Sequence, residues 1–449
     1  MKVKLIFLLF ILSFQLRAQE LDEKIDSYIK SYVNTSDFSG VVRIVKADTV
    51  IFDKAYGKAN QSFHISNTLN TRFKIGSISK QFTAAAILKL EEQGLLDIED
   101  DLSMYFPSYP NASGIKIKHL LTHTSGLIDL FSIPSFQKIQ TNKTSLSKLT
   151  GLLLSEKPRF KAGTKYEYSN GGYAVLAQLI EQLSHQSYAI FLNENIFKPL
   201  GMRRTGHSSS QDIVPNLAIG YDPKGYDGLK QADFVEHDLL KGSGSLYSTV
   251  GDLSIWVSTL KNRIYFSKAF YEEFFKDYGY NYGTGISLYT SYKQRVFGHD
   301  GRINGYMSDY LHYNDDDITI IILGNLQTGV ADFFRNDLAA IVFNEDYKSR
   351  AKTIPLAKQY PTNLKQYRGA YSFGPNFTVF IEKINGVLKA RANEGAYCEL
   401  VPLENTKFFS RTLYATVEFV SVEGEGMKMM WTNNDGDTFE GVRQIKKAQ

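Results

Sequence analysis

Residues 76–94 read Gly-Ser-Ile-Ser-Lys-Gln-Phe-Thr-Ala-Ala-Ala-Ile-Leu-Lys-Leu-Glu-Glu-Gln-Gly, and this stretch decides how the chain is interpreted. The run after Ser77 is rich in helix-forming residues and closes at Gly94, which predicts a largely buried helix beginning at Ser77. The first backbone N–H groups of a helix lack partners and favour negative charge. One turn on, Lys80 shares the face of Ser77. A lysine held against an apolar helix is desolvated, so its pKa falls and it can act as a base.

Two further motifs follow in order, Tyr168-Ser169-Asn170 and His299-Asp300-Gly301. With Ser77 and Lys80 they supply a nucleophile beside a lysine, a second hydroxyl that can carry a proton, an amide, and an edge-strand motif that ends in glycine. These groups suffice to acylate and deacylate a serine without a Ser-His-Asp triad. The bare Ser-x-x-Lys and Tyr-x-Asn patterns recur elsewhere in the chain, so their order and context carry the prediction.

Each of these residues also has an ordinary structural interpretation. Ser77 can be a helix cap beside a solvated Lys80. Tyr168 can be one of 28 mostly structural tyrosines. Asn170 can be a turn residue, because two glycines follow it, and His299 can satisfy a loop. The combination of motifs favours the catalytic interpretation over these alternatives.

The first 18 residues are expected to be a signal peptide rather than part of the fold. Lys2 and Lys4 precede an unbroken apolar run over residues 5–12, and Leu16-Arg17-Ala18 offers a cleavage site. The apolar run is too short to span a membrane. We therefore expect an exported protein, in the periplasm or the medium, with no membrane span after cleavage.

Charge and cysteine content exclude several classes of function. The 449-residue chain has a net charge of +4, and removal of Lys2, Lys4 and Arg17 leaves about +1. A nearly neutral protein has no global electrostatic reason to bind nucleic acid or anionic lipid. Cys398 is the only cysteine, so no internal disulfide forms. His119 and His123 are four residues apart, but they lack the glutamate of a zinc protease, and we expect no metal or cofactor.

The pattern of strands and helices predicts the fold class. Residues 40–56 form a predicted hairpin. Helices are expected near residues 115–121 and 173–183, and strands return at 294–298, 306–313 and 318–323, the last two joined by an acidic turn that includes Asp315, Asp316 and Asp317. Strands near both ends with helices between them suggest an α/β sandwich, in which helices flank an antiparallel sheet.

The character of the chain changes beyond residue 348. A polar, basic segment with two prolines covers residues 349–361, and short strand-like pieces separated by turns follow it. We predict a first domain at 19–348, a linker at 349–361 and a small all-β barrel at 362–449. The expected strands of this barrel are at residues 377–381, 386–390, 416–420 and 427–431.

With these motifs in place, residues 22–345 resemble the serine β-lactamase and penicillin-binding protein superfamily. The resemblance is to the branch of class C β-lactamases, D-amino-acid peptidases and esterases. Three further stretches match that superfamily: His119-Leu-Leu-Thr-His-Thr-Ser-Gly-Leu127, Phe197-Lys-Pro-Leu-Gly-Met202, and Gly244-Ser-Leu-Tyr-Ser-Thr249 followed by Asp252-Leu253. The downstream module resembles the lipocalin-like β-domain often appended to such proteins.

The resemblance implies a role for each site residue. Ser77 would be the nucleophile, Lys80 its base, and Tyr168 the carrier of the proton to the leaving group and an activator of the deacylating water. Asn170 would orient Lys80 and bind a substrate amide. The remaining substrate-binding residues would be His299, Gly301 and Arg302. The backbone N–H groups of Ser77 and Arg302 would form the oxyanion hole, and His119 and His123 would be structural supports.

The third motif departs from the β-lactamase pattern. His299 and Asp300 stand where β-lactamases carry lysine and threonine, which help to hold the carboxylate of a penicillin. A mostly neutral histidine is a weaker anchor. We therefore expect a serine hydrolase that acts on small esters or on D-amino-acid amides and peptides, that is, on a small-molecule or peptide substrate.

Three alternatives stay open at this point. They are a true β-lactamase, a non-catalytic relative that binds penicillin or peptide, and a protein whose C-terminal barrel does the main work. The barrel alternative predicts a ligand cavity lined by Phe380, Leu388 and Trp431. The chain has no G-x-S-x-G elbow, which disfavours an α/β-hydrolase. The oligomeric state is not predicted.

Overall fold

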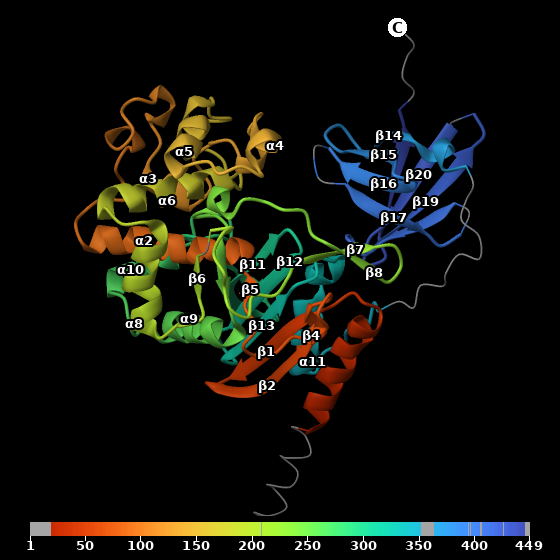
Figure 1. Cartoon of the computed structure of the whole chain (residues 1–449), viewed down its shortest axis with the longest axis horizontal. Coiled ribbons are helices and arrows are strands. Elements are labelled where there is room, and N and C mark those ends of the chain that lie inside the picture. The colour runs from red at the N-terminus through yellow and green to blue at the C-terminus, as the bar shows by residue number, and fades with distance from the viewer. Residues whose placement is uncertain are drawn as a thin grey trace, which may run out of the picture. The chain divides into compact units, whose positions relative to one another are not determined.

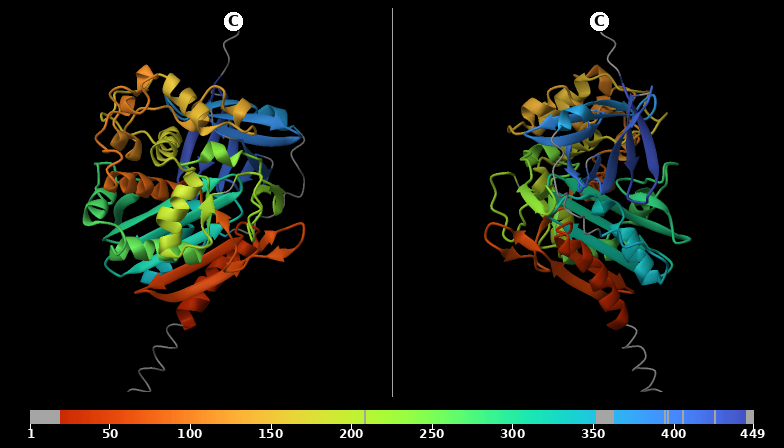
Figure 2. Two further views of the ribbon diagram at one scale, coloured as in Figure 1. Left: turned by 60° about the vertical axis from the view of Figure 1, so that its left-hand side comes forward. Right: turned by 90° about the vertical axis from the view of Figure 1, so that its right-hand side faces the viewer.

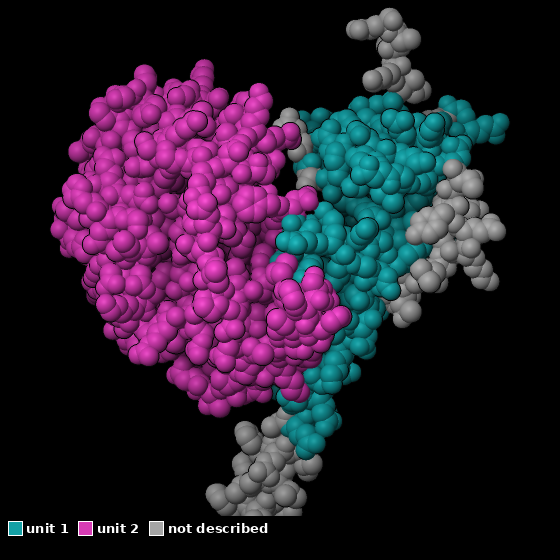
Figure 3. Space-filling view, viewed as in Figure 1, with its two compact units in different colours: residues 1–39, 220–232, 326–449 teal, residues 40–219, 233–325 magenta. Residues whose placement is uncertain are grey.

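The computed structural model describes residues 19–207, 209–351, 363–393, 395, 397–404, 406–424 and 426–444. The expected signal peptide and residues 352–361 of the expected linker lie outside this set. The described residues fall into two compact units (Figure 3). One unit consists of residues 40–219 and 233–325, and the other of residues 1–39, 220–232 and 326–449. The domain boundaries expected from the sequence stay a prediction.

The first unit is built on a six-stranded antiparallel sheet (Figures 1 and 2). Its strands, in spatial order, are β10 (Ser287–Ser291), β11 (Gln294–Ile303), β12 (Tyr306–Tyr313), β13 (Ile318–Gly324), β1 (Gly40–Lys46) and β2 (Thr49–Tyr56). The pairing of β1 with β13, from Gly40 with Gly324 to Lys46 with Ile318, joins the two ends of this unit. β13 is buried throughout and rich in isoleucine, as a central strand requires.

Helices and short strands occupy the segment between β2 and β10. The helices are α2 (Ser79–Glu92), α3 (Ile117–Leu121), α4 (Phe136–Ile139), α5 (Leu146–Ser155), α6 (Asn170–Ser184), α7 (Tyr188–Leu192), α8 (Lys198–Leu200), α9 (Val250–Asn262) and α10 (Lys268–Phe274). The short strands are β3 (Lys58–Asn60), β4 (Ile65–Ser66), β5 (Phe73–Lys74), β6 (Gly206–His207) and β9 (Leu246–Ser248). The α/β sandwich expected from the sequence is confirmed.

The helix α2 lies at the centre of this unit. It contacts α6, α7 and α10, and its residues from Ser79 to Leu88 are all buried. The side chain of Gln81 ties α2 to its neighbours, because its Oε1 accepts hydrogen bonds from Trp256 Nε1 at 2.7 Å and from the Tyr310 hydroxyl at 2.5 Å. The residues around Ser77 are thus held by both the helices and the sheet.

The second unit contains a closed barrel of eight antiparallel strands. They are β14 (Gly369–Ser372), β15 (Thr378–Ile384), β16 (Val387–Ala392), β17 (Cys398–Pro402), β18 (Lys407–Ser410), β19 (Ala415–Val422), β20 (Gly426–Thr432) and β21 (Thr438–Arg443). The expected barrel is confirmed. The same unit holds the hairpin of β7 (Tyr221–Lys224) and β8 (Gly228–Gln231), a helix over residues 19–34, and α11 (Phe334–Phe343).

The barrel alternative placed Phe380, Leu388 and Trp431 around a ligand cavity, and the prediction is wrong for Phe380. Leu388 is buried in the barrel core and Trp431 packs against that core. Phe380 lies between the buried residues Val379 and Ile381, so strand alternation points it to the other face. There its ring lies 4.5 Å from the guanidinium carbon of Arg391.

Among the described residues, no helix is both long and apolar enough to cross a membrane.

Candidate active site

Ser77 lies in a single 3₁₀ turn, Gly76–Ile78, immediately before α2. The prediction that Ser77 begins the α-helix is therefore wrong by one short turn, since α2 starts at Ser79. The Ser77 side chain is half-buried, whereas Lys80, in the first turn of α2, is fully buried. The two side chains still meet: Lys80 Nζ is 3.0 Å from Ser77 Oγ.

Three oxygen acceptors surround the Lys80 amine. Besides Ser77 Oγ, it donates to Asn170 Oδ1 and to the backbone carbonyl of Ser243, both at 2.8 Å. Burial lowers the pKa of Lys80 to about 7, although the charges of Asp129 and Asp300 act in the opposite direction. The amine is therefore neutral in a large fraction of molecules at physiological pH and can accept a proton from Ser77.

Tyr168 lies next to both Lys80 and Ser77. The Lys80 ammonium is 4.8 Å from the centre of the Tyr168 ring. Burial raises the pKa of the Tyr168 hydroxyl, while its hydrogen bond with Ser77 lowers it by less. The phenol stays protonated at neutral pH, which suits a group that passes protons between neighbours.

Asn170 is fixed by a residue that the sequence motifs did not indicate. The Asp129 carboxylate accepts hydrogen bonds from the Asn170 backbone N–H at 2.7 Å and from its side-chain amide at 2.9 Å. These bonds fix the amide orientation, so that Oδ1 faces Lys80. Asn170 is the first residue of α6, and Ser169 caps that helix by accepting from the N–H of Gly172.

The strand β11 passes very close to the turn that carries Ser77. A Cβ atom on Gly301 would lie 2.2 Å from the Ile75 carbonyl oxygen and 2.9 Å from the Ser77 amide nitrogen, so only glycine fits. A Cβ atom on Gly76, whose φ is +48°, would lie 2.8 Å from the amide nitrogen of Arg302. The backbone amides of Ser77 and Arg302 thus lie where the Ser77 turn contacts β11, and an oxyanion hole requires two such neighbouring donors.

Three aromatic side chains behind Tyr168 form a hydrogen-bonded row. The Tyr282 hydroxyl lies 3.0 Å from His299 Nε2 and 3.3 Å from His123 Nε2. The ring of His123 packs 4.1 Å from that of Tyr168, and its Nδ1 accepts the Ser169 N–H at 3.1 Å. Burial lowers the pKa of both histidines, so both are neutral at pH 7.

The sequence motifs indicated His123 and His299 of this row but not Tyr282. His123 supports the site through Tyr168, which agrees with the structural role expected for it. Tyr282 follows no recognisable motif, and only the fold brings it to His299. His119 lies apart from this row; its Nδ1 accepts the Lys116 N–H at 3.0 Å at the start of α3.

Replacing Tyr282 by phenylalanine is expected to lower kcat about tenfold, because His123 and His299 would both lose a hydrogen-bond partner that positions them. The pH at which activity rises should stay unchanged, because Lys80 is untouched. The matched control is Tyr271→Phe, a buried tyrosine whose hydroxyl donates to the Thr259 carbonyl at 3.3 Å. Steady-state rates across pH test this, and equal losses in the two variants would refute a role for Tyr282.

No group of three or more His, Cys, Asp or Glu side chains among the described residues could hold a metal ion. The acidic turn after β12 is a hairpin turn, as expected from the sequence. Its Asp317 accepts from Lys261 Nζ at 2.6 Å, and Asp316 accepts from the side chain of Gln294 at 2.7 Å.

The fold and comparisons with known proteins define the class as a serine hydrolase. The chain belongs to the family described as Beta-lactamase, whose pattern matches residues 25–344. Penicillin-binding protein 4* of Bacillus subtilis strain 168 is 30% identical over 432 residues, which cover 90% of this chain and 95% of that protein.

Two solved structures share the fold. The penicillin-binding protein from Bacillus halodurans has a TM-score of 0.63 and 23% identity, over 70% of this chain and 98% of that one. The D-amino acid amidase from Ochrobactrum anthropi SV3, complexed with L-phenylalanine, has a TM-score of 0.62 and 21% identity, over 72% of this chain and 99% of that one.

Proposed function

We propose that this protein hydrolyses small esters, or D-amino-acid amides and peptides, through a covalent acyl-enzyme on Ser77. One observation carries the proposal: the buried Lys80 amine, whose pKa burial lowers to about 7, lies 3.0 Å from the Ser77 hydroxyl. A structural lysine would keep its charge and pair with a carboxylate, whereas this amine contacts a hydroxyl, an amide oxygen and a carbonyl.

Acylation begins when neutral Lys80 takes the proton of the Ser77 hydroxyl. Ser77 Oγ then forms a bond to the substrate carbonyl carbon, and the carbonyl oxygen gains negative charge. The N–H groups of Ser77 and Arg302 are the donors for that oxygen. Tyr168 gives a proton to the departing alcohol or amine and regains one from Lys80 as the tetrahedral intermediate collapses.

Deacylation uses the same groups in reverse. Water attacks the acyl carbon, its proton passes through Tyr168 to Lys80, and Ser77 leaves with that proton from Lys80. Asn170 keeps Lys80 aimed at Ser77 and can donate its remaining amide hydrogen to the substrate. His299, with Gly301 and Arg302, forms the wall of the site on β11.

The charges near β11 favour substrates without a carboxylate at this position. His299 is 5% exposed, and burial lowers its pKa, so the ring is neutral at pH 7. The Asp300 carboxylate is 64% exposed and has an oxygen 4.0 Å from His299 Nδ1. A carboxylate gains far less from a neutral ring than from an ammonium group, and the nearby Asp300 opposes it.

We expect kcat/KM to be larger for p-nitrophenyl butyrate or D-alanine amide, which carry no carboxylate, than for nitrocefin. The double change His299→Lys with Asp300→Thr should raise nitrocefin acylation about tenfold relative to ester hydrolysis, because it adds a cation and removes an anion. The ratio is the proper measure, because loss of Asp300 also changes the field at Lys80 for every substrate. Asp300→Thr alone is the control. Nitrocefin as the best of the three substrates would instead indicate a β-lactamase.

Export of the protein is also part of the proposal. The basic, then apolar character of residues 1–18 supports it. The mature N-terminus found by sequencing the protein from a fractionated host should lie near residue 19, and retention of the intact N-terminus in the cytoplasmic fraction would contradict export.

A further inference from the structure

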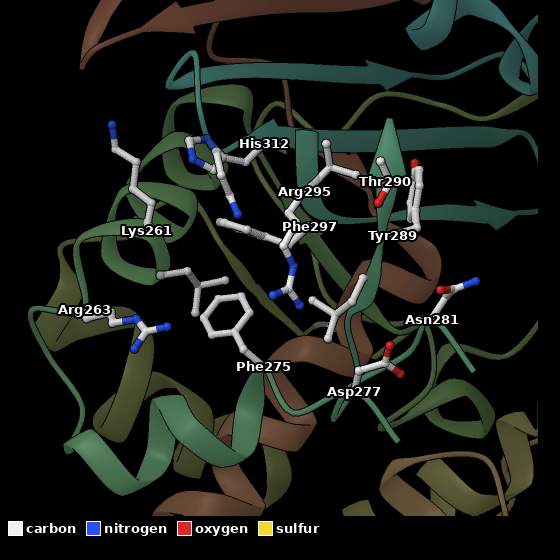
Figure 4. Close-up of a pocket in the computed structure, with 14 residues that line it drawn as sticks. Lys261, Arg263, Phe275, Asp277, Asn281, Tyr289, Thr290, Arg295, Phe297 and His312 are labelled. Carbon is white, nitrogen blue, oxygen red and sulfur yellow. The ribbon is translucent and has the colours of Figure 1, made fainter. Parts of the chain in front are cut away.

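A cavity lies on β11 away from Ser77 (Figure 4). Its volume is about 440 Å³, within the range of small-molecule sites. It is formed by the end of α9, the loop after α10, and the strands β10, β11 and β12. None of the seven site residues proposed above lines it. On β11, Phe297 of this cavity is two residues from His299.

Aromatic rings form the inner wall of the cavity. The rings of Phe275 and Phe297 lie 5.1 Å apart at a steep angle, and that of His312 lies 4.8 Å from Phe297. Leu260 and Leu288 add aliphatic surface. This wall offers a flat apolar ligand the edge and face contacts that aromatic groups prefer.

The cations of the cavity differ in how they are paired. Lys261 is neutralised by Asp48 at 2.8 Å and Asp317 at 2.6 Å. Arg263 and Arg295 have no carboxylate partner among the residues that the structure describes. In Figure 4 the guanidinium of Arg295 points toward the middle of the lining residues, whereas the Lys261 amine points away from them.

The other polar groups leave room for an anion. The Asp277 carboxylate already accepts the backbone N–H groups of Gly279 and Tyr280, at 2.8 and 3.3 Å. His312 Nδ1 lies 2.9 Å from the Thr319 hydroxyl, which leaves Nε2 of that buried ring for a ligand. Two arginines against one engaged aspartate make the cavity a site for negative charge.

We propose that this cavity binds a small organic acid with one carboxylate and an aromatic body. The carboxylate pairs with the Arg295 guanidinium, with Arg263 as the second cation, and the ring packs against Phe275 and Phe297. An aromatic acid uses both features of the site at once, whereas inorganic phosphate would leave the aromatic wall without contacts. The inference does not depend on the proposed activity at Ser77.

Calorimetric titration of the full-length protein with benzoate tests the proposal, with benzamide as the uncharged probe of the same shape. Benzoate should bind with a Kd of about 1 mM or tighter, and benzamide at least about tenfold more weakly. Arg295→Gln should weaken benzoate at least about tenfold, because a bidentate charged contact is lost, and leave benzamide unchanged.

The control is Arg203→Gln, which removes an exposed arginine outside the cavity and should leave benzoate binding unchanged. Arg295 is also exposed, so its replacement should not disturb folding, and thermal unfolding verifies this. The proposal is overturned if no binding is seen at a benzoate concentration about ten times the expected Kd. It is also overturned if benzamide binds as tightly as benzoate. The same holds if Arg203→Gln and Arg295→Gln weaken benzoate binding to the same extent.

Discussion

Replacement of Ser77 by alanine is expected to lower kcat/KM for the preferred ester by about a thousandfold or more, as the loss of a covalent nucleophile does. Among the residues that the structure describes, Ser77 Oγ is the only group within 3.0 Å of Lys80 Nζ that can both lose a proton and attack a carbonyl, because the other two contacts are amide-type oxygens. The fold should survive, since the half-buried Ser77 side chain holds no backbone group in place.

A second Ser-x-x-Lys pair in the chain supplies the matched control. Ser113 and Lys116 have the same spacing, but Ser113 is exposed, and Lys116 forms an ion pair with Glu99 at 2.7 Å. Ser113→Ala should therefore keep full activity. Initial rates with p-nitrophenyl butyrate on both variants make the comparison. Retention of more than about a tenth of the wild-type rate in Ser77→Ala would contradict covalent catalysis at this residue.

Lys80→Arg is expected to be nearly inactive, with a loss of similar size. The guanidinium keeps its proton at any accessible pH, so it cannot accept one from Ser77. Because Lys80 is fully buried, the larger side chain can also disturb the fold. Lys80→Met, which keeps length without charge, should be equally inactive, and the thermal unfolding midpoint of each variant separates misfolding from lost chemistry. An acylation rate equal to wild type in a folded Lys80→Arg protein would refute the base role.

The pH dependence of the wild type follows from the same residue. Base catalysis needs neutral Lys80, so kcat/KM should be low under acid conditions and rise as pH passes about 7, the value to which burial lowers the Lys80 pKa. The pKa shifts of His123, His299 and Tyr168 do not account for this rise. Burial lowers the pKa of His123 and His299 and raises that of Tyr168. A profile that is flat between about pH 6 and 8 would contradict a titrating Lys80.

The sequence predicted the fold from its strongest local signals. The strand expected at residues 306–313 is found over the same residues as β12, because a segment with three tyrosines lies between Gly305 and an acidic turn, and tyrosine favours strands. Four barrel strands were missed: β14, β17, β18 and β21. β21, for example, reads Thr-Phe-Glu-Gly-Val-Arg and is mostly exposed, so its pairing with β20, rather than its own pattern, makes it a strand.

The site was predictable where chemistry needs a fixed spacing along the chain. Ser77 and Lys80 are three residues apart, and the sequence alone could pair them. Asp129 and Tyr282 could not be found in this way, because their contacts with Asn170 and His299 depend on how distant segments fold together. The cavity on β11 was missed for the same reason, since its wall combines residues from α9, the loop after α10 and three strands.

The most direct test of the account is the site of covalent modification by a fluorophosphonate probe. The protein is incubated with the probe, its intact mass is measured, and the labelled peptide is sequenced by mass spectrometry. If Ser77 is the nucleophile, the protein carries one adduct per chain, located on Ser77, and Ser77→Ala carries none. An adduct on any other serine, or undiminished labelling of Ser77→Ala, would contradict the assignment of Ser77 as the nucleophile.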